Sequence, residues 1–171
     1  MQPYFLAVAV LFPIVMGGVL PLLPFRNRRQ MMIYIEAVVL LNSALVLGLL
    51  FTQPQEACVL LRFTGNLSLS FQLDGLGTVF AGIVSLLWPL ASLYAFEYMK
   101  HEGHEKIFFM FYTMTYGVTL GIAFAEDIVT MYCFYEMLTL MTLPLIMHTL
   151  SREAILASRS YLYYSLGGAA F

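Results

Sequence analysis

An acidic residue inside a long apolar segment is the feature that most constrains this chain. Residues 128–150 are long and apolar enough to cross a bilayer as a helix, yet they include Glu136. At about 1.5 Å per residue, Glu136 lies roughly 12 Å from the start of that helix, near the middle of a hydrocarbon core about 30 Å thick. A charge there costs roughly 2.5–3.5 kcal/mol on insertion scales. Two interpretations follow: a proton-transfer group, or a neutral structural acid hydrogen-bonded to a neighbouring helix.

Composition supports a membrane protein. Hydrophobic residues make up 61% of the chain and charged residues 11%, far from the average of about 25% charged in soluble proteins. The basic clusters are short and flank apolar segments, so no nucleic-acid binding is indicated. Cys58 and Cys133 fall in a loop and in a span, so no disulfide between them is expected. The first apolar segment lacks a basic start and a cleavage site, which is typical of a retained helix rather than a signal peptide.

The apolar segments predict an all-α integral membrane protein with a single membrane domain. We expect a multi-span helical bundle of five full spans and the start of a sixth. The spans are predicted at residues 4–24, 31–51, 76–99, 107–125 and 128–150, with an incomplete one at 159–171. Between spans two and three, residues 59–64 and 67–73 predict a small extramembrane β-hairpin about Gly65-Asn66. In the fourth span, Gly117 and Gly121 predict a close approach of another helix.

Several charged residues near span ends have structural interpretations. Asp74 precedes the third span and is expected to cap its N-terminus. Glu36 lies near the basic end of the second span, where a snorkelling or ion-paired carboxylate is favoured. Glu97 lies in the last turn of the third span, opposes the helix dipole, and is expected to pair with Lys100 or the next loop.

The surroundings of Glu136 on its own helix are polar. Residues three and four positions away share its face, so Tyr132 and Thr139 are its neighbours, and Thr142 lies one turn further on. Their hydroxyls could bind the carboxyl group or ordered water. His148 lies roughly 18 Å away and cannot touch Glu136 directly, so it is interpreted mainly as an interface residue and only weakly as a relay member.

The distribution of basic residues predicts an orientation. If the five spans alternate, seven basic residues fall on one side of the membrane and only Arg62 on the other. The seven are Arg26, Arg28, Arg29, Lys100, Lys106, Arg152 and Arg159. The positive-inside rule then puts the N-terminus outside and the basic loops in the cytoplasm.

Three segments of the sequence resemble a known family. Leu73-Asp74-Gly75-Leu76, residues 94–99 (Y-A-F-E-Y-M) and residues 134–140 (F-Y-E-M-L-T-L) are similar to the antiporter-like proton-channel subunits. These occur in respiratory complex I (NADH:quinone oxidoreductase), in energy-converting membrane hydrogenases and in multi-subunit sodium/proton antiporters. The resemblance covers the whole chain but only the opening part of a typical member.

The resemblance implies a role for Glu136. It matches the family's fifth-helix glutamate, which transfers protons together with a lysine on a later, broken helix, and this sequence contains no counterpart of that lysine. Arg159, before Tyr161, resembles the basic-aromatic start of the family's sixth helix. Gly77 departs from the pattern, because many members have serine there.

Together these features predict a function in ion transport. We expect a proton- or cation-translocating subunit of a multi-subunit, redox-driven complex, with other membrane subunits and the lipid bilayer as partners. A bacterial or archaeal plasma membrane is the expected location. No metal site, cofactor or catalytic site is expected in the chain, since His101 and His104 read as part of a charged connector, and any enzyme activity would belong to the complex. The alternative is a structural or assembly subunit whose Glu136 is only a buried hydrogen-bonding group.

Overall fold

A computed structural model describes residues 4–52, 57–64, 67–101, 103–147 and 152–170. The elements in order are α1 (Tyr4–Val19), η1 (Leu20–Leu22), α2 (Arg28–Thr52), β1 (Cys58–Thr64), β2 (Leu67–Phe71), α3 (Gly75–Tyr98), η2 (Met99–His101), α4 (Glu105–Ala123), α5 (Ile128–Ile146) and α6 (Arg152–Ala170). In the described part of the chain, five helices are long and apolar enough to cross a membrane. The predicted all-α membrane fold, with five spans and a small hairpin between the second and third, is therefore confirmed.

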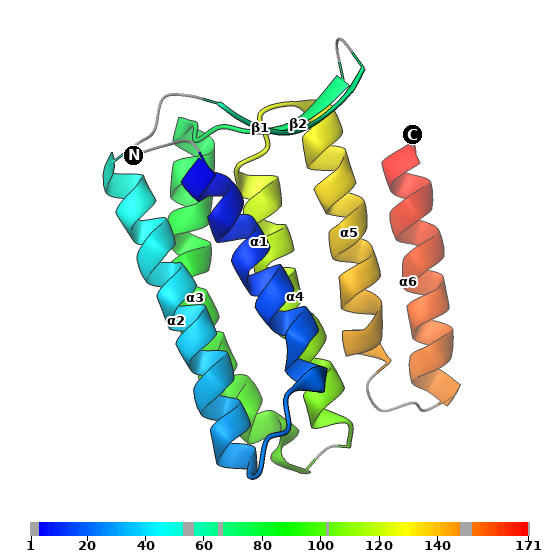
Figure 1. Ribbon diagram of the computed structural model, residues 1–171. Coiled ribbons are helices and arrows are strands. Elements are labelled where there is room, and N and C mark those ends of the chain that lie inside the picture. Colours follow the sequence, from blue (N-terminus) through cyan, green and yellow to red (C-terminus); the bar gives the residue numbers. More distant parts are fainter. Residues whose placement is uncertain (1–3, 53–56, 65–66, 102, 148–151, 171) are drawn as a thin grey trace.

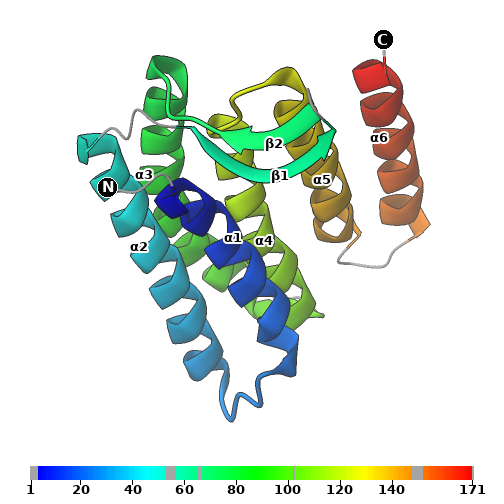
Figure 2. The same cartoon turned by 45° about the horizontal axis from the view of Figure 1, so that its top comes forward.

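The helices lie side by side with their connections at two opposite ends (Figure 1). At one end are the turns between α1 and α2 and between α3 and α4, which carry Arg26, Arg28, Lys100 and Lys106. We call this the basic end. At the other, the hairpin end, β1 and β2 lie across the tops of α1, α4 and α5 (Figure 2).

Helix α4 is the centre of the bundle and packs against α1, α2, α3 and α5. Its two glycines allow close contacts, but with different helices. A Cβ atom on Gly117 would lie 2.3 Å from the Val10 carbonyl oxygen of α1, and one on Gly121 would lie 2.3 Å from the ring of Phe134 on α5. Both positions therefore require glycine because the facing atoms occupy the space of a side chain.

The helix boundaries differ from the expected spans mainly at α6. This helix begins at Arg152 and not at Arg159, because residues 152–158 are rich in helix-forming Ala, Leu, Arg and Glu and continue the helix beyond its apolar part. Helix α2 also begins earlier than expected, at Arg28, and α5 ends earlier, at Ile146. Hydrophobicity locates the part of a helix that suits lipid, whereas backbone hydrogen bonding sets its ends.

The hairpin is antiparallel, pairing Cys58 with Phe71 and Thr64 with Leu67. The predicted Gly65-Asn66 turn lies outside the described residues. Strand β2 is joined to the connection between α4 and α5: the Gln72 N–H donates to the Phe124 carbonyl at 2.8 Å. The ring of Phe71 is fully buried and lies 5.4 Å from that of Phe134. The hairpin thereby fixes the start of α5.

Candidate functional site

The carboxyl group of Glu136 is buried in the middle of α5. Neither of its oxygens is accessible to solvent, and neither has a hydrogen-bond partner among the residues that the structure describes. The Tyr132 hydroxyl, one turn earlier, interacts electrostatically with Glu136 but does not meet hydrogen-bond geometry to it. A buried polar group without a partner costs roughly 1–3 kcal/mol, and more if it is charged. The described residues therefore do not supply the hydrogen-bond partner that this carboxyl group needs.

Hydroxyl groups join α5 to α6 on the basic-end side of Glu136. Thr139 Oγ1, on a fully packed residue, lies 3.0 Å from Ser165 Oγ. One turn further, Thr142 Oγ1 lies 3.3 Å from the Tyr161 hydroxyl. The hydroxyls expected near Glu136 thus lie in the α5/α6 interface, where they can exchange hydrogen bonds.

A hollow lies between α5 and α6 on the hairpin-end side of Glu136. Its volume is about 510 Å³, and its lining includes Tyr132, Tyr135 and Ser165. Since Tyr132 and Tyr135 stand four and one positions before Glu136, the hollow begins within one helical turn of the carboxyl group. It is large enough for several water molecules, whose individual share of liquid volume is about 30 Å³.

The start of α5 is held in place by Asp127. Its carboxylate accepts from the Thr130 backbone N–H at 2.6 Å, which caps the helix, and from the Ser70 hydroxyl of β2 at 3.1 Å. The Thr130 backbone N–H, with further hydrogen bonds from Thr130 and Ser70, lowers the pKa of Asp127 below its usual value. The hairpin and the cap together fix the position of the helix that carries Glu136.

The other predicted residues lie apart from Glu136. Asp74 caps α3, accepting from the Gly77 N–H at 2.5 Å. Glu97 lies 3.3 Å from the Lys100 ammonium group at the basic end. Arg159 is exposed on α6 without an ion pair to any described residue. His148 lies outside the described residues, so the structure does not relate it to Glu136.

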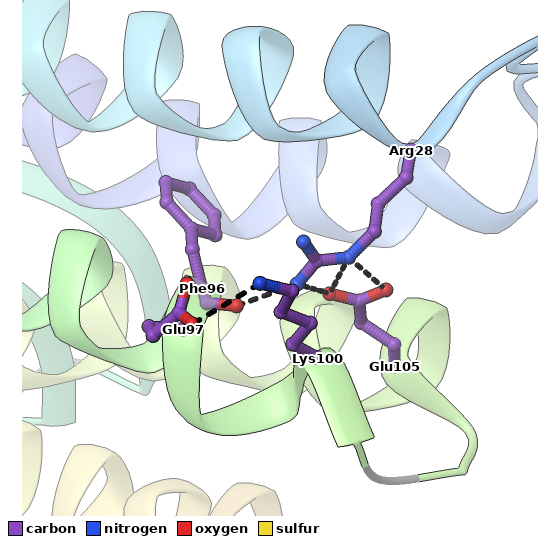
Figure 3. A network of polar contacts seen from close by, with 5 residues as sticks. All are labelled: Arg28, Phe96, Glu97, Lys100 and Glu105. Carbon is purple, nitrogen blue, oxygen red and sulfur yellow. Dashed lines mark hydrogen bonds and ion pairs between the residues drawn. The ribbon is translucent and has the colours of Figure 1, made fainter.

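Glu36 differs most from its expected environment. It does not pair with an arginine, and one of its carboxyl oxygens lies within hydrogen-bonding distance of the Ser92 hydroxyl of α3. The nearby Arg28 instead binds Glu105 of α4, with distances of 2.8 and 2.9 Å from Nε to the two carboxylate oxygens (Figure 3). Arg28 also donates to the Phe96 carbonyl at 2.5 Å, so it links α2, α3 and α4.

Sequence reasoning did not identify the polar residues at the centre of α2. Asn42 and Ser43 are buried, and Ser43 Oγ lies 2.8 Å from the Tyr116 hydroxyl of α4. The Asn42 side chain lies near that hydroxyl, but neither of its amide atoms has a hydrogen-bond partner among the described residues. Two adjacent polar residues in a 25-residue apolar helix are a signal that could have been followed.

No group of three or more potential metal ligands occurs among the described residues.

Comparisons with known proteins identify relatives of the chain. Residues 62–109 match the family model described as NADH-Ubiquinone oxidoreductase (complex I), chain 5 N-terminus. The Na(+)/H(+) antiporter subunit A1 of Staphylococcus aureus is 24% identical over 170 residues, covering 95% of this chain and 21% of its own length. The same subunit from strain JH9 gives the same identity and coverage. The chain thus spans about a fifth of the length of these relatives.

A solved structure shares the fold. The membrane-bound sulfane sulfur reductase (MBS), an archaeal respiratory membrane complex, contains a chain that superposes with a TM-score of 0.81 at 15% sequence identity. The match covers 96% of this chain and 34% of the other. The fold of nearly the whole chain therefore has a known counterpart. Its sequence motifs, its relatives and its fold together support the antiporter-like subunit family of multi-subunit membrane complexes.

Proposed function

We propose that this chain is the ion-translocating, antiporter-like part of a subunit in a multi-subunit, redox-driven membrane complex, and that Glu136 takes up and releases the transported proton. The observation that carries this proposal is the buried carboxyl group of Glu136, which has no hydrogen-bond partner among the described residues. An acid that served only to join helices would be expected to have one, because satisfied partners are what make a buried polar group stabilising.

The groups around Glu136 support proton transfer. The Thr139–Ser165 and Thr142–Tyr161 hydroxyl contacts lie towards the basic end, and the hollow lined by Tyr132 and Ser165 lies towards the hairpin end. Hydroxyls and water both donate and accept hydrogen bonds, so they can pass a proton along a chain. Glu136 stands between the two sets.

Protonation of Glu136 would respond to a nearby cation. Desolvation favours the neutral acid, and an approaching positive charge favours the carboxylate. A basic group from another helix or subunit could therefore drive the proton off Glu136 and let it return on withdrawal. Conformational or redox energy released elsewhere in the complex would move that group.

The proposed setting is the plasma membrane of a bacterium or archaeon, with other membrane subunits as partners. The basic end would face the cytoplasm and the hairpin the outside, because positively charged connections are retained on the cytoplasmic side.

The test is Glu136→Gln in the complete complex, reconstituted into vesicles. Glutamine keeps the shape of the side chain and cannot take up a proton. We expect ion translocation to fall by about 10²-fold or more, the range for loss of a positioned proton-transfer group. Glu97→Gln is the matched control, since Glu97 is an exposed carboxylate at the basic end, and translocation should be unchanged.

Measurement of internal pH with a trapped dye reports the rate, and detergent gel filtration reports whether the complex is intact. Unchanged translocation by Glu136→Gln in an intact complex would reject the transport role. It would support the alternative, a structural or assembly subunit in which Glu136 is only a buried polar group.

A further inference from the structure

The interface of α2, α3 and α4 contains a second polar region, whose side chains are buried or partly buried. We call it the α2–α4 polar file, and it consists of Glu36, Asn42, Ser43, Trp88, Ser92, Tyr112 and Tyr116. Glu36 and Ser43 are seven residues apart on α2, so they lie two turns apart on one face. The file therefore runs along the membrane normal for about 10 Å, from the basic-end half towards the middle of the bundle.

The Ser92 hydroxyl lies between two oxygen atoms, one of them on Glu36. Ser92 is fully buried, and its Oγ lies within hydrogen-bonding distance of both a Glu36 carboxyl oxygen and, at 2.7 Å, the Pro89 carbonyl oxygen. A hydroxyl has one proton, and it cannot serve both acceptors well. If Glu36 carries a proton, it donates to Ser92 Oγ and Ser92 donates to Pro89. The Glu36 oxygen that faces Ser92, the Ser92 hydroxyl and the Pro89 carbonyl oxygen then each take part in a hydrogen bond.

Aromatic residues continue the file from Glu36 towards the centre. Tyr112 interacts electrostatically with Glu36. The Trp88 ring lies 5.4 Å from that of Tyr112 and 5.0 Å from that of Tyr116. The Tyr116 hydroxyl then contacts Ser43 Oγ at 2.8 Å. The ring contacts of Trp88 thus join α3 to α4, and the contact between the Tyr116 hydroxyl and Ser43 joins α4 to α2.

The file also contains unsatisfied polar atoms. Five buried side-chain nitrogen or oxygen atoms lack a hydrogen-bond partner in the described part of the chain. Two belong to Glu136, and the other three are Asn42 Nδ2, Asn42 Oδ1 and Trp88 Nε1. Asn42 is 1% exposed, so its amide needs partners inside the protein. Unsatisfied buried polar groups of this kind are the ones that buried water molecules bind.

No cation neutralises Glu36 within the described residues. Helix α2 packs against α1, α3 and α4, and the described residues of α1 include no charged side chain. The titratable side chains that the structure describes in η2 and in the basic-end half of α2, α3 and α4 are Arg28, Arg29, Tyr34, Tyr94, Glu97, Tyr98, Lys100, Glu105, Lys106 and Tyr112. Arg28 is engaged with Glu105, Lys100 with Glu97, and Lys106 with the carbonyls of Pro21 and Leu23.

We propose that Glu36 is a second proton-binding site, holding its proton against Ser92, and that buried water along Asn42 and Trp88 connects it to the middle of the bundle. This site lies on the opposite side of α4 from the α5/α6 interface. It goes beyond the role proposed for Glu136 and does not depend on it.

A hydrophobic carbodiimide tests this proposal, because it reacts with protonated carboxyl groups in apolar surroundings. The whole protein in its native membrane is labelled between pH 6 and pH 9, and the modified residues are identified by mass spectrometry. We expect Glu36 to be labelled several-fold more than the exposed Glu97, and its labelling to fall as the pH rises. Absence of labelling at Glu36 across this range would overturn the proposal.

Two serine variants separate proton binding from a structural role. In Ser92→Ala the acceptor for the Glu36 proton is removed, so labelling of Glu36 at pH 7 should fall. The control is Ser85→Ala, because Ser85 is equally buried on α3 but bonds only the Gly82 carbonyl in the described structure. An increase of labelling in Ser92→Ala would show that Ser92 donates to an ionised Glu36, which contradicts the proposal.

The labelling of Glu36 tests the second site independently of transport through Glu136. If Glu36 fails to react while Glu136→Gln still abolishes translocation, only the second site is rejected. If Glu36 reacts as expected and Glu136→Gln has no effect, only the proposed function is rejected.

Discussion

The region of α1 to α4 and the region of α5 and α6 are built differently. Eight of the nineteen residues of α4 are buried, against three of the nineteen of α5. In the first region, the acid Glu105 has a bidentate arginine partner (Figure 3), whereas in the second Glu136 has none in the described structure. Buried residues are thus concentrated around α4, and the unsatisfied acid lies in the region with fewer of them. Sites that must change state are drawn from the less stable parts of a protein.

Replacement of glycine by alanine should show the largest difference between the two regions in the free energy of unfolding. Gly117→Ala places a methyl group 2.3 Å from the Val10 backbone oxygen, so α1 and α4 must separate. We expect a loss of about 2–3 kcal/mol in the free energy of unfolding, the range for overpacking a core. The measurement is unfolding of the purified protein in detergent.

The control for this contrast is Gly167→Ala in α6, where no described atom lies within 4 Å of the new methyl group. It should be neutral or stabilise the helix by up to about 1 kcal/mol. An equal loss at both positions would break the comparison and show that another helix packs against α6.

Replacement of Arg28 at the basic end should cause the next largest loss in the free energy of unfolding. Arg28→Met leaves Glu105 without its partner and removes a donor from the Phe96 carbonyl. The side chains are 35% and 17% exposed, so solvent reduces the cost to about 1–3 kcal/mol. A double-mutant cycle with Glu105→Met measures the coupling. Arg159→Met on α6 is the control, and a matching loss there would contradict the assignment.

Loss of the Asp127 cap, which joins the two regions, should reduce the free energy of unfolding by an intermediate amount. Asp127→Ala removes the acceptor of the Thr130 N–H and should cost about 1 kcal/mol. Because the folded pKa of Asp127 lies below its unfolded value, this contribution is fully present above about pH 5 and is lost as the pH falls through the folded pKa.

Unfolding of Asp127→Ala and the parent protein is compared at pH 7 and pH 4. The difference in the free energy of unfolding between the two proteins should be smaller at pH 4 than at pH 7. Glu126→Ala, at the exposed neighbouring position, should be neutral at both values. A difference that grows with acidity would contradict the role of the ionised carboxylate.

The smallest effect on stability is expected at Glu136 itself. Glu136→Gln removes no hydrogen bond seen in the described structure, so the free energy of unfolding should change by less than about 0.5 kcal/mol. Glu105→Gln, which weakens the contact with Arg28, should cost more, about 1–2 kcal/mol. A large loss for Glu136→Gln would indicate a structural partner and would sharpen the case for the alternative function.

Much of the fold could be predicted because lipid imposes a simple constraint. A run of about 20 apolar residues has few options other than a helix, and the alternating segment at 67–73 has few other than a strand. The start of α6 was not predictable in the same way, since residues 152–158 begin with two charged side chains and form a helix through local propensity. Asp74 and Asp127 both precede a helix and cap it, a local interaction of three residues.

The candidate site was only partly predictable. Glu136 stands out because a carboxylate in an apolar helix is costly wherever it faces. The partner of Glu36 was not accessible, because Ser92 is 56 residues away and serine is common in such helices. The same holds for Arg28 and Glu105, which are 77 residues apart.

The sequence by itself determined that the chain crosses a membrane repeatedly, that a hairpin separates the second and third spans, and that an acid lies deep in the fifth. Each of these follows from local hydrophobicity, chain length and the cost of a buried charge. Only the tertiary structure decided which acid is paired and which is not. That distinction depends on side chains brought together from distant helices, and their contacts leave no periodic or local pattern in the sequence.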